Sequence, residues 1–347
     1  MSITAAAANA AAEVSVPKKP SQSERFTLLV MKAFNQNIAG GLQVTDYQRQ
    51  LIQGYFIGID RALKTAEENR LTKNKNNSKR EFDNPLPCTW ENVNALDLAL
   101  DVVHYARMGL DMMQDNHLSP IPYRNKKTDK YDITLMPGYN GIQYIAEKYA
   151  VEPPLAVTIE LVYTTDHFKP IMKSVSNKVS SYEFEIPQPF DRGDIVGGFG
   201  YIEYEDPTKN KLIFMPIAAI LKRKPEYAAA EFWGGKSKRW TTNEAGKRVQ
   251  QEVEVDGWFE EMCWKTLKRE VYSSKHIPRD PKKIDNNYQH MKLQEARIAD
   301  MNAQAEIYDN ANADIIDIPE VKTVETSSGI PANETPAVEE PPGGPDF

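Results

Sequence analysis

Apolar residues recur along this chain with two different periods, and the change of period divides the sequence into blocks. A spacing of three and four residues is typical of amphipathic helices. It marks five segments, at residues 28–38, 47–63, 90–110, 217–223 and 258–272. Residues 155–163 instead alternate along the chain, which is typical of a half-buried strand. Helices followed by strands and again by helices predict an α+β fold rather than a doubly wound parallel sheet.

The central strands are expected to form an antiparallel meander with one helix embedded in it. Further strands are expected at residues 121–123, 131–136, 179–186, 195–204 and 211–215. The run RNKKTDK separates the first two, which predicts a hairpin with a basic tip. A glycine-rich turn at residues 138–141 precedes apolar residues at helical spacing, which predicts the embedded helix.

Two N-terminal segments make specific predictions. In segment 90–110, Leu96, Leu100 and Val103 share the face that is expected to be buried, and Gly109 is a typical helix stop. Residues 61–80 carry seven basic and two acidic side chains. We interpret this run as a solvated loop.

Charge is distributed unevenly between the body of the chain and its C-terminal end. The whole chain has 42 basic and 49 acidic residues, a net charge of −7. Residues 301–347 hold one Lys and ten Asp or Glu, a net charge of −9, which leaves 41 basic and 39 acidic residues, a net charge of +2, in residues 1–300. The acidity of the whole chain therefore does not exclude a nucleic-acid partner.

Composition predicts three parts. They are a disordered, Ala-rich leader at residues 1–24, a folded domain at residues 25–292, and a disordered acidic tail rich in Pro and Glu at residues 293–347. The leader lacks the features of a secretory signal. Apolar stretches fall short of the roughly 20 residues that cross a bilayer. We therefore expect a cytoplasmic protein.

Motifs of common enzyme classes are absent from the sequence, which contains no GxxxxGK[ST], no HExxH and no GxSxG. The two cysteines, Cys88 and Cys263, lack metal-ligand spacing, so neither a disulfide framework nor a structural zinc is expected. Glu203, Glu205 and Asp206 are candidate Mg²⁺ ligands for a nuclease, with a solvated turn as the alternative.

The helix expected at residues 258–272 has a basic side. At 100° per residue, Lys265, Lys268 and Arg269 fall in one narrow sector, whereas Cys263 and Leu267 point to the opposite side. One face is therefore expected to be buried and the other to be basic. The alternative is an ordinary solvated face stabilised by ion pairs within the helix.

A second basic segment, residues 231–253, interleaves five cations with Trp233 and Trp240. Cations that contact phosphates, together with rings that stack on bases, are typical of single-strand binding. Packing of these two Trp side chains in the core is the alternative.

Two glycine motifs are also candidates for backbone contacts. The GYNG turn at residues 138–141 opens a helix whose free amides suit a phosphate, although glycine in a tight turn needs no ligand. The GGFG run at residues 197–200 indicates a bulge or the close approach of another backbone, from a neighbouring subunit or a nucleic acid.

Five segments follow one another in a characteristic order. They are NALDLALDVVHYARMGLD, LSPIPYRNKKTDKYDITLMPGYNGIQYIAEKYA, VYTTDHF, GDIVGGFGYIEYEDPTKNKLIFMPIAAILKRK and WFEEMCWKTLKRE. Their order resembles the RecT family of phage single-strand annealing recombinases, over about residues 25–280. Glu147 and Trp264 stand where the family often has basic residues, so no phosphate contact is carried over to them.

The resemblance implies a protein of phage or prophage origin that binds single-stranded DNA, assembles into a ring or filament, and anneals complementary strands without ATP. It implies no required cofactor, with Mg²⁺ a candidate modulator of DNA binding. The implied partners are single-stranded DNA, the annealed duplex and further copies of the chain. A phage exonuclease and a host single-strand-binding protein, in the cytoplasm of a bacterial host, are candidates.

Nine side chains are expected to line the DNA groove. They are Arg124, Lys126, Lys127, Tyr139, Lys222, Arg223, Lys265, Lys268 and Arg269. If about six of them contact phosphates, affinity should fall roughly 1000-fold between 50 and 200 mM salt. Two alternatives stay open: a metal-dependent nuclease acting on single-stranded DNA, and a structural oligomer without nucleic-acid function.

Overall fold

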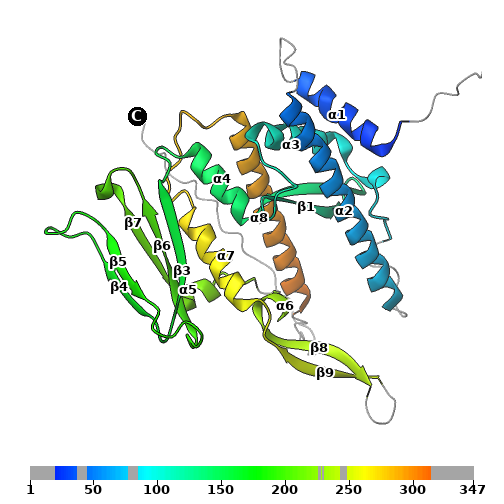
Figure 1. The fold of residues 1–347 in the computed structure, drawn as a ribbon. Coiled ribbons are helices and arrows are strands. Elements are labelled where there is room, and N and C mark those ends of the chain that lie inside the picture. Colours follow the sequence, from blue (N-terminus) through cyan, green and yellow to red (C-terminus); the bar gives the residue numbers. More distant parts are fainter. Residues whose placement is uncertain are drawn as a thin grey trace, which may run out of the picture. The chain divides into compact units, whose positions relative to one another are not determined.

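The computed structural model describes residues 20–36, 45–76, 85–225, 228, 230–242 and 248–313 (Figure 1). The chain divides into two units, Met1–Ile298 and Ala299–Phe347, and the elements that form the site lie in the first. The predicted α+β class is confirmed, with helices at both ends and antiparallel sheets between them.

The helices are α1 Gln22–Gln36, α2 Asp46–Asn76, α3 Ala95–Met108, α4 Tyr139–Tyr149, α5 Ile217–Leu221, α6 Ala230–Trp233, α7 Phe259–Val271 and α8 Asn286–Ala313. The strands are β1 Leu118–Asn125, β2 Lys130–Pro137, β3 Ala156–Tyr163, β4 His167–Ile171, β5 Ser181–Glu185, β6 Ile195–Glu203, β7 Lys211–Pro216, β8 Gly235–Thr242 and β9 Arg248–Val255. Short 3₁₀ turns lie at Trp90–Asn92 and Pro207–Lys209.

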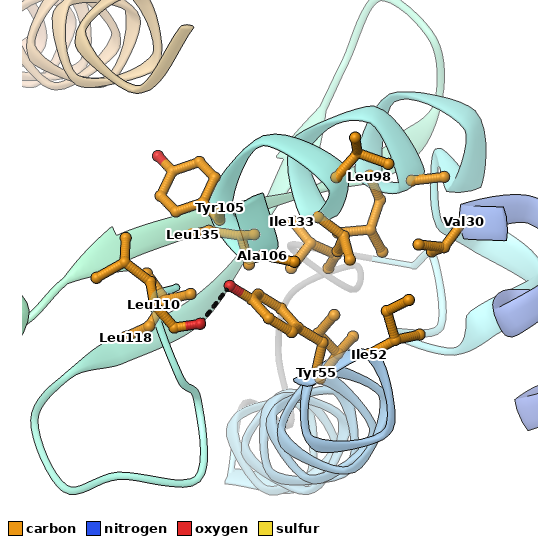
Figure 2. Close-up of a cluster of buried hydrophobic side chains, with 14 of the residues drawn as sticks. Val30, Ile52, Tyr55, Leu98, Tyr105, Ala106, Leu110, Leu118, Ile133 and Leu135 are labelled. Carbon is orange, nitrogen blue, oxygen red and sulfur yellow. Dashed lines mark hydrogen bonds between the residues drawn. The ribbon is translucent and has the colours of Figure 1, made fainter. Parts of the chain in front are cut away.

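The first core joins α1, α2 and α3 to the β1–β2 hairpin. Val30, Leu98 and Ile133, from α1, α3 and β2, are buried together, and Tyr55 of α2 is fully buried among them (Figure 2). The Tyr55 hydroxyl donates a hydrogen bond of 2.9 Å to the Leu110 carbonyl, which satisfies the one polar group of this side chain.

The second core lies between the sheet β3–β6–β7 and α7. The strands pair in the order β3–β6–β7, all antiparallel. The β4–β5 hairpin, inserted between β3 and β6 in the sequence, places Phe168 and Phe184 against Phe199 of β6. Side chains alternate along a strand, so Gly198 and Gly200 face the side of the sheet opposite to Phe199, and α7 covers that side.

Two N-terminal predictions differ from the structure. Residues 61–76, interpreted as loop, continue α2, because Leu63 is buried in the first core and Glu67 pairs with Arg70 at 2.6 Å one turn later. Helix α3 ends at Gly109 as predicted, in a left-handed conformation with φ 83°. Its buried face is centred on Leu98 and Val102, however, and Leu96 is 68% exposed.

The predicted ends of the domain also differ. Helix α1 begins at Gln22, inside the predicted leader 1–24, because Ser21 and Glu24 form a reciprocal capping box. Helix α8 extends to Ala313, inside the predicted tail 293–347, through a stretch rich in strong helix formers such as Ala, Glu and Gln. The rest of both predicted segments, residues 1–19 and 314–347, lies outside the described residues.

Strands β8 and β9 were not expected. They form a two-stranded hairpin that extends from α6 and α7, in the basic segment 231–253, for which no secondary structure was predicted (Figure 1). Lys236 of β8 stands opposite Glu254 of β9, a cross-strand arrangement of opposite charges that stabilises a hairpin.

Candidate nucleic-acid interface

Two glycines of β6 determine how closely α7 packs against the sheet. A Cβ on Gly198 would lie 2.6 Å from Leu267 Cδ2, and one on Gly200 would lie 2.3 Å from Val271 Cγ2. The sequence predicted a bulge or a close approach at this GGFG run. The register of β3 and β6 shifts next to Tyr163, as a bulge would require. The close approach, however, comes from side chains of α7 in the same chain and not from the backbone of a neighbouring subunit or a nucleic acid.

The opposite side of α7 borders a hollow of about 640 Å³. Cys263 and Leu267 are buried on the sheet side, as predicted. Four of the predicted site residues line the hollow, and they are Tyr139, Arg223, Lys265 and Arg269. Among the described residues, no acidic side chain lines this hollow, so its electrostatic potential favours an anion.

The other walls of the hollow are polar or apolar but uncharged. The β1–β2 hairpin contributes Ser119, Ile121 and Met136, and Trp233 of α6 and Met262 of α7 also line the hollow. A groove with cations on one wall and apolar side chains on another suits a phosphate backbone with bases beside it. It contains no array of paired amides that would read one base sequence.

Tyr139 is held firmly at the first position of α4. Its hydroxyl accepts a hydrogen bond of 3.0 Å from Asn116 Nδ2, and its ring meets Trp264 edge to face at 5.7 Å between centroids. Lys265 Nζ lies 5.8 Å from the ring centroid. Trp264 also donates a hydrogen bond to the Ile159 carbonyl, so this departure from the family pattern has a structural role.

Lys268 does not have the exposed position that the helical wheel predicted. It is only 7% exposed and does not line the hollow. Its Nζ donates a hydrogen bond of 2.8 Å to Asn140 Oδ1 and lies 5.0 Å from the Tyr139 ring centroid. Burial lowers the pKa of this ammonium. The reason is that α4 packs over this flank of α7, which a wheel drawn for one helix does not show.

Arg223 reaches the hollow from the turn after α5. Its Nη2 also lies 2.7 Å from Glu270 Oε2, at the C-terminal end of α7. The neighbouring Lys222 is exposed and does not line the hollow. The two adjacent cations therefore have different surroundings.

The predicted cations of the β1–β2 tip lie at the other end of the hairpin. Ser119 and Met136, which line the hollow, are partners near its base, whereas Arg124 is paired with Tyr131 near the tip. Arg124 forms an ion pair of 3.2 Å with Asp129, and Lys126 and Lys127 lie in the turn. The hairpin and its basic tip are confirmed, but the tip does not share the hollow with α7.

Three of the four amides in the GYNG turn already donate hydrogen bonds within the chain. The N–H groups of Gly138, Asn140 and Gly141 donate hydrogen bonds to the carbonyls of Asn116 and His117. A Cβ on Gly138 or Gly141 would lie about 2 Å from these carbonyl oxygens. The glycines therefore permit close packing of α4 against the turn at Asn116 and His117, which precedes β1. The expectation that a phosphate binds at this helix start is wrong for these amides.

The basic segment 231–253 is only partly within the described side chains. Trp233 is 9% exposed and packs against Phe259, which supports core packing for this residue. Lys236 lies 3.7 Å from Glu252 across the β8–β9 hairpin. Lys247, and the side chains of Lys238, Arg239, Trp240 and Arg248, lie outside what the structure describes.

A second hollow, of about 500 Å³, adjoins the first and was not predicted. The two share Asn116, Ser119 and Ile121, and the second extends to Arg61 and Asn69 of α2. These side chains lie in the segment interpreted as loop. In a helix, residues spaced by four lie on one face, so a helical interpretation of this segment would have placed Arg61, Thr65 and Asn69 together.

The carboxylates considered as Mg²⁺ ligands lie at the end of β6 and in the turn that follows it. Asp206 accepts hydrogen bonds from the backbone and hydroxyl of Thr208, which lower the pKa of its carboxyl. Across the described part of the chain, no three His, Cys, Asp or Glu side chains are grouped to hold a metal ion. No helix within the described ranges is long and apolar enough to span a membrane.

Comparison with known proteins gives one match. A sequence model described as the RecT family matches residues 83–269, more than half of the chain. This range runs from the segment before α3 to Arg269 of α7, so it includes every residue named above as lining the first hollow. No curated protein and no solved structure matches the chain.

Proposed function

Because the chain belongs to the RecT family, we propose that it binds single-stranded DNA in the groove beside α7 and anneals it to a complementary strand during recombination. The observation that carries this proposal is the convergence of Arg223, Lys265 and Arg269 on one hollow that no acidic side chain lines among the described residues. These cations come from two segments that are more than forty residues apart in the sequence.

The chemistry of the groove favours binding without sequence preference. Lys and Arg side chains contact phosphates and carry little information about the bases. A protein that grips the backbone leaves the Watson–Crick edges free to pair. Each new base-pair step then contributes roughly 1.4 kcal/mol on average, so annealing needs no ATP once the strand is held extended.

Several finer points belong to the same proposal. The chain acts as a ring or filament of identical subunits, is not an enzyme, and needs no cofactor. It originates from a phage or prophage and works in the cytoplasm of a bacterial cell beside an exonuclease and the host single-strand-binding protein. These points rest on the family membership.

A salt titration tests the groove. With Arg223, Lys265 and Arg269 as phosphate contacts, the affinity for a single strand should fall roughly 20-fold between 50 and 200 mM salt. Reversing two charges, with Lys265→Glu and Arg269→Glu together, should abolish binding and annealing of fluorescent oligonucleotides. Arg49→Glu with Lys282→Glu is the matched control, because both side chains are exposed and line neither hollow.

Two results would contradict the proposal. One is binding that does not depend on salt, and the other is wild-type annealing by the Lys265/Arg269 variant. Incubating the same labelled strands with Mg²⁺ tests the nuclease alternative in parallel, because fragments would indicate cleavage and intact strands would not.

A further inference from the structure

A third hollow, of about 400 Å³, lies on the other side of the Arg223–Glu270 ion pair. It is bounded by β7, by the segment that follows β4 and by the segment that follows α7. Lys173, Lys211 and Lys275 come to it from these three parts of the chain. None of the three belongs to the groove beside α7.

The charges around this hollow leave an excess of positive charge. Glu270 is its one acidic lining residue among those described, and Arg223, His276 and Lys275 lie 2.7, 3.0 and 3.4 Å from its carboxylate. The lining therefore holds three lysines against one carboxylate, and Arg223, which does not line this hollow, also pairs with that carboxylate.

Lys211 shows the effect of this imbalance. Its Nζ donates a hydrogen bond of 2.6 Å to the His276 carbonyl, which orients it but does not neutralise it. Burial and the nearby charge of Lys173 lower the pKa of Lys211. A bound anion would offset both effects, because an opposite charge stabilises the protonated amine.

Apolar side chains stand beside these cations. Phe214 of β7 is 55% exposed and Met172 is 48% exposed, and both line the hollow. Phe214 is three residues after Lys211 on the edge strand β7, so the two side chains point to opposite faces of the strand and reach the hollow around its edge. A cation that contacts phosphate beside an open aromatic ring is the combination that binds single strands without sequence preference.

We infer that this hollow is a second subsite for single-stranded DNA, in which Lys173, Lys211 and Lys275 contact phosphates and Phe214 stacks on a base. Arg223 connects the two sites, because it lines the groove and pairs with Glu270, which lines this hollow. One strand therefore runs from the groove past the C-terminal end of α7 to the edge of β7. The inference rests on the proposed function of the groove.

The test compares two double variants of the full chain. The test variant carries Lys173→Gln and Lys275→Gln together, and the control carries Lys178→Gln and Lys282→Gln together. All four lysines are exposed, and the control pair lines neither site. Losing two phosphate contacts should make the salt dependence shallower, so that the ratio of wild-type to variant affinity rises roughly sevenfold when salt falls from 200 to 50 mM. The control ratio should not change.

Oligo(dT) of increasing length separates the two sites. The Lys173/Lys275 variant should bind short strands like the wild type and lose affinity only above the length that reaches the second subsite. Phe214→Ala should weaken binding of long strands at least fivefold without changing the salt dependence, because stacking contributes about 1 to 3 kcal/mol per base.

The outcomes distinguish this inference from the proposed function. Equal binding by the Lys173/Lys275 variant and its control at every length overturns the second subsite but leaves the groove intact. Tighter binding by that variant also overturns it, and would indicate that the lysines hold an acidic segment of the chain. A wild-type chain that retains no oligonucleotide contradicts both.

Discussion

Lys268 of α7 and Tyr139 of α4 are neighbours in space although they are far apart in the sequence. Asn140, the residue after Tyr139, comes 128 positions before Lys268. The Lys268 ammonium lies 5.0 Å from the Tyr139 ring centroid and donates a hydrogen bond to Asn140. A buried cation thus joins the two helices that form one wall of the groove. We expect Lys268 to position Tyr139, whereas Lys265 lines the groove itself.

We expect Lys265→Met and Lys268→Met to weaken DNA binding in different ways. Removing a phosphate contact at Lys265 should lower the slope of log affinity against log salt by about 0.7. Lys268→Met should reduce affinity through a displaced Tyr139 while the slope stays unchanged. Salt titrations of both variants measure this difference, and an equal drop in slope would show that Lys268 contacts phosphate.

A methyl group at Gly200 should push α7 away from the sheet. Its Cβ would lie 2.3 Å from Val271 Cγ2, and overpacking of this kind costs about 1 to 3 kcal/mol. Gly200→Ala should therefore lower the free energy of unfolding in urea and weaken DNA binding, because α7 carries Lys265 and Arg269.

Val271→Ala provides the control for this contact. In the double variant the smaller side chain leaves space for the methyl group, so a double-mutant cycle should give a favourable coupling of about 1 kcal/mol. Strictly additive effects would mean that the two residues do not clash.

Glu270 should make stability depend on pH in the acidic range. Burial alone would raise its pKa, but hydrogen bonds from His276 and Arg223, together with their charges, lower it below the ordinary value of 4.5. A lowered carboxyl pKa stabilises the fold above pH 4.5, and this contribution is lost as pH falls through the folded-state pKa.

Glu270→Gln tests this linkage. Near neutral pH the variant should be less stable than the wild type by about 1 to 3 kcal/mol, because hydrogen bonds to a charged group are lost. The difference should shrink as pH falls below 4.5. Urea unfolding at several pH values measures it, and a difference that grows toward acid pH would have the wrong sign.

Both cysteines should be unreactive in the folded chain. Cys88 and Cys263 are free and buried, and burial raises the pKa of each thiol to about 11. Because the thiolate is the reactive form, a thiol reagent near neutral pH should label neither until the protein unfolds. Labelling with and without urea checks this, and rapid modification of the native chain would contradict the packing of α7 around Cys263.

Local patterns in the sequence predicted the elements that carry the groove. The alternating strands, the glycine stop of α3, the β1–β2 hairpin and the two faces of α7 each depend on residues a few positions apart. Local patterns gave a wrong prediction where the charge of a segment and the spacing of its apolar residues indicated different structures. The basic run at residues 61–76 was interpreted by its charge, although its apolar side chains at helical spacing continue α2.

Residue patterns along the chain were enough to predict the α+β class, the basic residues on one side of α7 and membership of the RecT family. Which cations share a surface became clear only from the packing of distant elements. It brought Arg223 to Lys265 and Arg269, left the tip of the hairpin apart, and buried Lys268 under α4. The physical reason is that exposure depends on which distant element packs against each flank of a helix, and periodicity within one helix carries no information about that neighbour.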